Sequence, residues 1–165
     1  KGCQARINVG DGTLLALATV GNSEIAVGGT DRSLFVFDVR KRTQLHRIPG
    51  IVKYEITAVC ASRVNTKAVY VTSLDHEIAM IDYTRKSASH LARHSLRGDS
   101  RWVGVDLVPE LRSTGNKTPG PTTEDFVGVT DTGRFYVIRD AWRMMQPRTP
   151  TAAPNQKKQP ASAPN

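Results

Sequence analysis

The sequence predicts an all-β fold built from a repeated unit of short antiparallel strands. Residues 33–39 alternate apolar side chains on both faces, the period of two that a strand buried between layers requires. Glycine and aspartate stand just before this strand, and both favour tight turns. The octet at 31–38, DRSLFVFD, returns 44 residues later at 75–82 as DHEIAMID, and more weakly at 132–139 as TGRFYVIR. The same unit therefore occurs three times.

The first unit is expected to contain four strands. The apolar run at 14–20 is bounded by turn residues and is interpreted as the innermost strand. Strands at 24–30 and 33–39 follow it. A shorter, more polar strand at 44–48 suits an outermost position near solvent. Residues 3–9 are expected to form a further short strand ahead of this unit.

The second and third units keep the same order of strands. In the second unit the expected strands are 55–62, 68–73, 77–83 and 88–96. In the third unit they are 102–108, 125–130 and 134–138. An insertion at 109–124, rich in glycine, proline, threonine and charge, separates the first two strands of the third unit. No fourth strand follows, so the last unit is predicted to be incomplete.

The chain divides by composition into a folded part, residues 1–141, and a tail, residues 142–165. From about residue 146 the tail consists largely of proline, alanine, glutamine, asparagine and lysine. Such a segment buries too little apolar area to offset the conformational entropy that ordering would cost. The tail is therefore predicted to be disordered.

The octets and their spacing resemble the turn-and-strand motif of WD40 repeats, in which each unit of about 40 to 45 residues forms one blade of a β-propeller. The resemblance covers about residues 14–140. It implies a WD40-like propeller segment of about three four-stranded antiparallel blades. Propellers usually contain about four to eight blades, so the remaining blades are expected from a longer chain. Ending on a third strand resembles the C-terminal end of a propeller.

The match to the family pattern is partial. Asp31 and Asp75 fill its turn position, and Ser73 and Thr130 fill the hydroxyl position on the second strand. Gly29 stands where the first blade would carry a hydroxyl, and no Gly-His pair precedes the first strands. The positions of the family's tryptophan hold three other apolar residues, Phe37, Ile81 and Ile138.

Length, composition and charge limit the possible functions. The chain has 165 residues, a formal net charge of +8 and 39% hydrophobic residues, enough for a folded core with a polar appendage. Cys3 and Cys60 offer neither a disulfide framework nor metal-ligand spacing, which favours a reducing compartment. No apolar run approaches the roughly 18 residues of a membrane span, so no membrane partner is expected.

No catalytic, cofactor or metal site is predicted. His90 and His94 have HxxxH spacing, but on a strand they would lie about 13 Å apart. Ser73, Asp75 and His76 contain the residue types of a hydrolytic triad, yet their place in a hairpin explains them structurally. The protein is therefore not expected to be an enzyme.

The basic residues are the candidate partner contacts. Arg40, Lys41 and Arg42 cluster at the hairpin tip of the first unit, and Arg85 and Lys86 occupy the matching tip of the second. One hypothesis is a single basic rim that attracts acidic proteins or phosphate backbones. The alternative is that these charges only solvate the hairpin tips. The full set of candidate contacts is Arg40, Lys41, Arg42, Arg47, Arg85, Lys86, Arg97 and Trp102.

These observations favour a non-catalytic WD-repeat scaffold that holds other proteins in a multiprotein complex. The segment 34–59 is similar to the late blades of nucleolar WD-repeat ribosome-assembly factors, which implies a nuclear or nucleolar ribonucleoprotein complex; the cytoplasm is the alternative location. The second hypothesis is a direct RNA-binding module that uses the basic rim. Aromatic residues are not interleaved with the charges, so base-specific recognition is not indicated.

Overall fold

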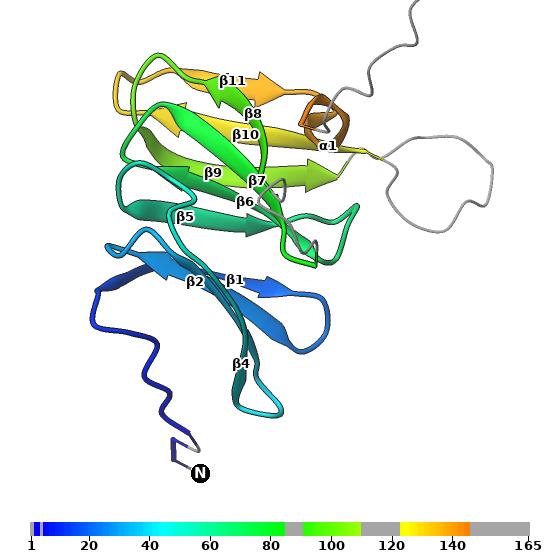
Figure 1. Cartoon of the computed structure of the whole chain (residues 1–165). Coiled ribbons are helices and arrows are strands. Elements are labelled where there is room, and N and C mark those ends of the chain that lie inside the picture. Colours follow the sequence, from blue (N-terminus) through cyan, green and yellow to red (C-terminus); the bar gives the residue numbers. More distant parts are fainter. Residues whose placement is uncertain (1, 4, 85–90, 110–122, 146–165) are drawn as a thin grey trace, which may run out of the picture.

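The computed structural model describes residues 2–3, 5–84, 91–109 and 123–145, and these form three antiparallel sheets that follow one another along the chain (Figure 1). The prediction of an all-β fold of three repeated units is confirmed. The predicted tail from residue 146 and most of the predicted insertion, residues 110–122, lie outside the described residues.

Sheet 1 has the strand order β1-β2-β3-β4. Its strands are β1 (Leu14–Val20), β2 (Glu24–Gly29), β3 (Leu34–Asp38) and β4 (Thr43–Ile48). All five residues of β3 are buried because both faces of the sheet are covered at this strand. Most of β4 is exposed, as expected for an outermost strand.

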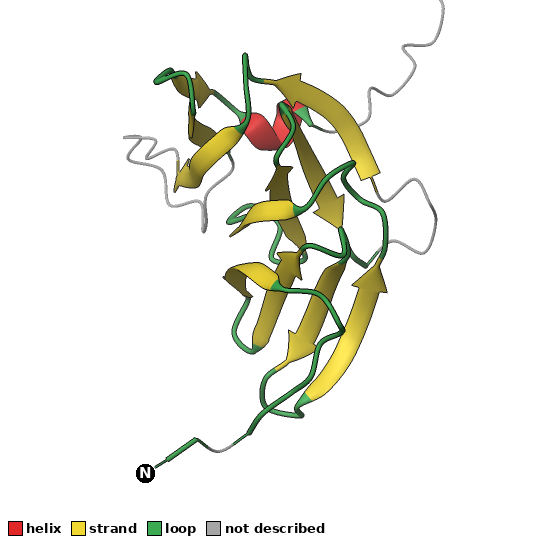
Figure 2. Ribbon diagram, turned by 90° about the vertical axis from the view of Figure 1, so that its left-hand side faces the viewer, coloured by secondary structure: helices red, strands yellow, loops and turns green. Residues whose placement is uncertain are grey.

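Sheet 2 repeats this order as β5-β6-β7-β8. Its strands are β5 (Ile56–Ala61), β6 (Ala68–Ser73), β7 (Glu77–Asp82) and β8 (Leu91–Arg97). All six residues of β6 are buried, since this sheet lies between the other two (Figure 2).

Sheet 3 contains three strands among the described residues, in the order β9-β10-β11. They are β9 (Trp102–Pro109), β10 (Glu124–Thr130) and β11 (Phe135–Ile138). The prediction of an incomplete third unit is confirmed. A short helix, α1 (Ala141–Met144), follows β11.

Two expectations about the ends of the folded part are wrong. Residues 5–9 form no strand; instead, Val9 packs against the outer face of sheet 1. The tail was expected to begin at residue 142, but α1 continues the folded part, and Ala141 and Met145 are fully buried against sheet 3. Apolar residues at helical spacing explain this, since positions 141 and 145 lie on one face of a helix.

The sheets pack face to face through two cores. The first core, between sheets 1 and 2, includes Val36, Ile56 and Val71. The second, between sheets 2 and 3, includes Tyr70 and Phe126. The innermost strands lie side by side, β1 next to β5 and β5 next to β9. Within the described ranges, no helix is long and apolar enough to span a membrane.

Candidate interaction surfaces

The aspartates at the ends of the first two octets stabilise turns. Asp31 Oδ1 accepts a hydrogen bond from the backbone amide of Ser33 at 3.0 Å. Asp75 Oδ1 accepts one from the amide of Glu77 at 3.1 Å and another from the Ser73 hydroxyl at 2.7 Å. These bonds satisfy amides that the strand ladder leaves free.

Asp38 fixes the turn between β3 and β4 in the same way. Its Oδ1 accepts the amides of Lys41 at 3.0 Å and Arg40 at 2.9 Å. These bonds, with the nearby positive charges, hold the pKa of the Asp38 carboxyl below its ordinary value. The basic tip (residues 40–42) is therefore built on an ordered turn.

The third unit replaces its missing octet aspartates with one from another turn. Asp99 Oδ1 accepts the hydroxyls of Thr130 at 2.9 Å and Tyr136 at 2.8 Å. Its Oδ2 accepts Thr132 Oγ1 at 2.6 Å and pairs with Arg134 at 2.9 Å. The bond from Thr132, followed by those from Tyr136 and Thr130, lowers the pKa of Asp99 strongly. The octet alone gave no signal for this network, because Asp99 lies 33 residues before Thr132.

A buried glutamate joins sheet 3 to sheet 2. Glu124, the first residue of β10, is fully buried. Its Oε1 accepts the hydroxyls of Ser62 at 2.6 Å and Tyr70 at 2.8 Å, and its Oε2 accepts the amide of Arg63 at 2.7 Å. These three hydrogen bonds connect β10 to sheet 2, and they replace the bonds to water that the carboxylate loses on burial.

Glu24, the first residue of β2, makes the equivalent link from sheet 1. It accepts the Lys67 ammonium at 2.5 Å and the Tyr83 hydroxyl at 2.6 Å, and both donors belong to sheet 2 and its loops. Partial desolvation raises the pKa of Glu24, but the bonds from Lys67 and Tyr83 outweigh it, and the net pKa is lowered. Neither glutamate could be identified from the sequence, since each partner lies more than 40 residues away.

The basic tip projects from the end of sheet 1. Arg40, Lys41 and Arg42 are exposed, and Arg40 Nη2 donates to Ser23 Oγ at 3.0 Å. None of the three forms an ion pair with a described residue. Although Asp38 lies at the base of the tip, the local charge therefore remains positive.

Other predicted contacts lie at the opposite end of the sheets. Arg47 is paired across the strands with Phe35 near the start of β3, and Arg97 with Glu77 at the start of β7, whereas the basic tip follows the end of β3. Arg47 lies 3.9 Å from Asp31, and Arg97 forms an ion pair with Glu77 at 2.5 Å. Arg47 and Arg97 therefore do not form one rim with the basic tip, and the neighbouring acidic residues partly neutralise their charges. Arg85 and Lys86 lie outside the described residues.

Trp102 is a core residue rather than a surface contact, which corrects its prediction as a partner residue. Only 2% of its surface is exposed, and its indole Nε1 donates to the backbone oxygen of His76 at 3.0 Å. The ring packs edge-on against Phe126 and Tyr136. It points toward sheet 2 because Gly128 leaves room for it: a Cβ at residue 128 would lie 2.7 Å from the ring.

Gly29, which departs from the family pattern, also has a steric reason. A Cβ at residue 29 would lie 1.9 Å from the backbone oxygen of Thr13, so no hydroxyl-bearing side chain fits there. The hydroxyl is supplied one residue later, where Thr30 Oγ1 accepts the amide of Thr13 at 3.0 Å.

Two of the candidate groups have structural explanations. Ser73 donates its hydroxyl to Asp75, which holds the turn before β7. Burial, with the charge of Asp106, raises the pKa of Cys60 to about 11, so its thiol stays protonated near neutral pH. His90 lies outside the described residues, and no group of three metal-ligating side chains occurs in the part of the chain that the structure describes.

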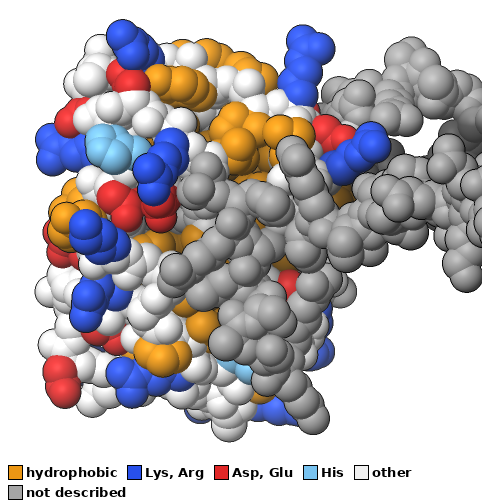
Figure 3. Space-filling model, turned by 45° about the horizontal axis from the view of Figure 1, so that its top comes forward, with side chains coloured by type: hydrophobic (Ala, Val, Ile, Leu, Met, Phe, Trp, Pro, Cys, Tyr) orange, Lys and Arg blue, Asp and Glu red, His pale blue; other side chains and the backbone are white. Residues whose placement is uncertain are grey.

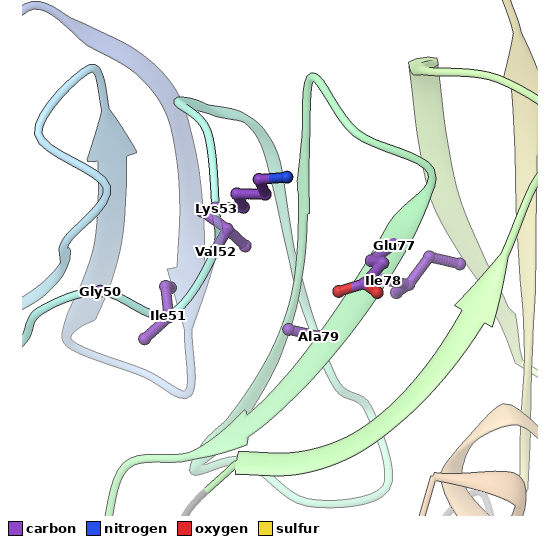
Figure 4. Close-up of a pocket in the computed structure, with 7 residues that line it drawn as sticks. All are labelled: Gly50, Ile51, Val52, Lys53, Glu77, Ile78 and Ala79. Atoms are coloured by element: carbon purple, nitrogen blue, oxygen red, sulfur yellow. The ribbon is translucent and has the colours of Figure 1, made fainter.

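The surface formed by the described residues includes two grooves of equal volume. One, of about 500 Å³, lies between the linker from β4 to β5 and the start of β7 (Figure 4). The other, also of about 500 Å³, runs along the innermost strands and includes Leu17, Cys60 and Asp106.

Apolar side chains are exposed on the outer face of sheet 3, which no described segment covers. Val129, Phe135 and Val137 are 38%, 65% and 51% exposed, and Val103 of β9 is 60% exposed. Val129 and Phe135 are direct cross-strand partners. Figure 3 shows hydrophobic side chains gathered at the end of the molecule that sheet 3 occupies. An apolar face of this kind indicates a surface that another protein layer covers.

Comparison with known proteins shows the fold. No protein-family model matches the chain, and no curated protein matches its sequence. Among solved structures, the crystal structure of Saccharomyces cerevisiae Sqt1, a WD40 propeller protein, is similar with a TM-score of 0.58 and 9% sequence identity. The match covers 78% of this chain and 31% of the Sqt1 chain. The three sheets are therefore consecutive blades of a WD40-like propeller, spanning about a third of that structure's length.

Proposed function

We propose that this protein is a non-catalytic WD-repeat scaffold that binds other proteins within a multiprotein complex. The observation that carries the proposal is the basic tip. Its three cations project on a turn fixed by Asp38 and form no ion pairs with described residues. Such a tip attracts acidic protein surfaces through long-range electrostatics.

We propose further blades as the first partners of this segment. The apolar face of sheet 3, which no described segment covers, supports this, because each of the other two sheets packs one apolar face against the next sheet. A further blade would bury Phe135 and Val137 in the same way. Covering a side chain of that size fully stabilises an interface by about 1.5–3 kcal/mol.

RNA binding is the second candidate function, and the same basic tip favours it. Its phosphate contacts would weaken steeply with salt. Protein binding is preferred because Phe37, the aromatic residue nearest to the tip in sequence, is only 3% exposed and is not available for stacking on a base. A nuclear or nucleolar ribonucleoprotein complex remains the proposed setting, supported by the net charge of +8 and the resemblance of residues 34–59.

Affinity purification of the full-length protein, with and without nuclease, tests this function. The variant Arg40→Gln/Lys41→Gln/Arg42→Gln neutralises the tip. Its control is Arg6→Gln/Arg139→Gln/Arg143→Gln, which removes the same charge from exposed residues elsewhere. We expect partner proteins to survive nuclease treatment and to be lost from the tip variant alone.

The other outcomes count against the proposal in separate ways. Loss of all partners on nuclease treatment would favour RNA tethering. Equal retention by the tip variant and its control would remove the tip as a contact. Equal loss in both variants would indicate that only the net charge matters.

A further inference from the structure

The groove between the β4–β5 linker and the start of β7 is lined in part by apolar side chains. Ile51 and Ala79 contribute to its floor with 3% and 7% of their surfaces exposed, whereas Ile78 packs into the core between sheets 2 and 3. Figure 4 shows the linker residues on one side of the space and the start of β7 on the other. Because the linker and β7 lie outside sheet 3, a further blade on the outer face of sheet 3 leaves this groove open.

Hydrogen bonds to the neighbouring turn hold the linker wall in place. The amide of Ile51 donates to the backbone oxygen of Arg32 at 3.3 Å. The Arg32 guanidinium in turn donates to the backbone oxygen of Lys53 at 3.5 Å. The opposite wall is part of β7, which is paired with strands on both sides. The groove is therefore largely preformed.

The charges around the groove are unequal. Lys53 lies on the linker wall and Arg32 in the turn beside it, and neither forms an ion pair with any acid in the described ranges. The Lys53 ammonium lies 5.2 Å from the ring centre of Tyr54. On the β7 wall, Glu77 is neutralised by Arg97, whose Nε and Nη2 both donate to its Oε1. The groove thus presents a net positive charge beside an apolar floor.

Exposed apolar side chains extend this surface beyond the groove. Tyr54 is 47% exposed and Leu74 is 39% exposed. Both lie at the same end of sheet 2, since the pairing of Ile56 with Ser73 brings their neighbours together. A segment of chain leaving the groove would meet apolar surface there.

We propose that this groove binds an extended acidic peptide segment of a partner protein. An aliphatic side chain of the peptide lies against the floor at Ile51 and Ala79, and a neighbouring carboxylate faces Lys53 and Arg32. This inference rests on the proposed scaffold function and specifies the chemistry of one partner. A nucleic acid fits less well, because a phosphate backbone gains nothing from an apolar floor.

The first experiment uses a ten-residue fluorescent peptide of alternating glutamate and leucine, with a glutamine–leucine peptide as its neutral control. Anisotropy titrations compare the wild type with Lys53→Glu and with Lys41→Glu, which makes the same charge change on the basic tip. We expect Lys53→Glu to weaken binding about tenfold and Lys41→Glu to change it less than about twofold. Amide chemical shifts should change at 50–53 and 77–79.

The groove proposal fails if both substitutions weaken binding equally or if the neutral peptide binds as tightly as the acidic one. It also fails if the chemical-shift changes are confined to sheet 3. Displacement of the peptide by polyuridylate RNA bound at residues 50–53 would overturn it as well.

Affinity purification with Lys53→Glu in the full-length protein separates the two proposals. If every partner of the wild type is retained, the groove fails while the scaffold stands. If the wild type itself binds no partner protein, the scaffold function fails.

Discussion

Three described residues other than glycine adopt left-handed backbone angles, and each lies where the chain changes direction. Arg32 (φ 60°) lies between β2 and β3, Arg42 (φ 58°) between β3 and β4, and Asp140 (φ 52°) just before α1. A side chain with a Cβ pays about 1–2 kcal/mol for this conformation. At Arg42 the strain lies within the basic tip, so charge is placed there at a cost in stability.

The first prediction concerns this strain. Arg42→Gly should raise the free energy of unfolding by roughly 0.5–1 kcal/mol, because glycine adopts positive φ readily although it loses more entropy on folding. Chemical denaturation measures the change. Lys41→Gly is the matched control, since Lys41 has no positive φ, and it should be neutral or destabilising. A loss of stability in Arg42→Gly as large as in the control would contradict the strain argument.

At the same scale, the basic tip could be predicted from sequence but the role of Trp102 could not. Charged side chains are rarely buried, so three consecutive cationic residues between two strands are expected in an exposed turn. The orientation of Trp102 depends on the space left by Gly128, which belongs to another strand. Such a contact appears only when strands distant in sequence are paired.

The strands themselves follow from local signals. The alternation in β3 and β7 and the aspartates that cap their turns lie within eight residues, so the octets locate both strands. Residues 5–9 also alternate in part, yet they form no strand because no neighbouring strand pairs with them. Strand formation there depended on a pairing partner that the sequence did not specify.

The second prediction concerns the Asp99 network that orders sheet 3. The folded pKa of Asp99 lies below its unfolded value of about 3.9. Its contribution to stability is therefore complete above about pH 4 and is lost as the pH falls toward the folded pKa, because the unfolded state then binds more protons. Asp99→Asn should lower stability at neutral pH and flatten the decline of stability between about pH 4 and pH 2.

Urea denaturation at a series of pH values measures this slope. Asp11→Asn, on an exposed loop, is the matched control and should retain the decline seen in the wild type. Parallel curves for Asp99→Asn and the wild type would show that the network does not contribute to acid sensitivity.

At the scale of the whole molecule, the two outer faces differ. On sheet 1, Val27, Phe35 and Phe37 are each only 3% exposed, since Val9 packs on them and the Arg47 guanidinium lies 5.5 Å above the Phe35 ring. No described segment covers sheet 3 in this way. The molecule therefore has one closed face and one open face.

The third prediction follows from the open face. The 165-residue chain should self-associate, and Phe135→Lys/Val137→Lys should shift it toward the monomer, raising the dissociation constant at least about tenfold. Light scattering coupled to size-exclusion chromatography measures this shift. Val39→Lys/Leu45→Lys changes two exposed apolar residues of the first unit, one in the turn after β3 and one in β4, and should have little effect. A monomeric wild type, or equal effects of both variants, would contradict the prediction.

The two glutamates at the starts of β2 and β10 imply an order in which the molecule comes apart. Each reaches from an end sheet into sheet 2 and binds one of its tyrosines. Fraying of sheet 1 or sheet 3 removes only one of these anchors, so the central sheet keeps the other. Its backbone amides should then be the slowest to exchange their hydrogens with solvent, and the protein should lose structure from its two flanks toward its middle.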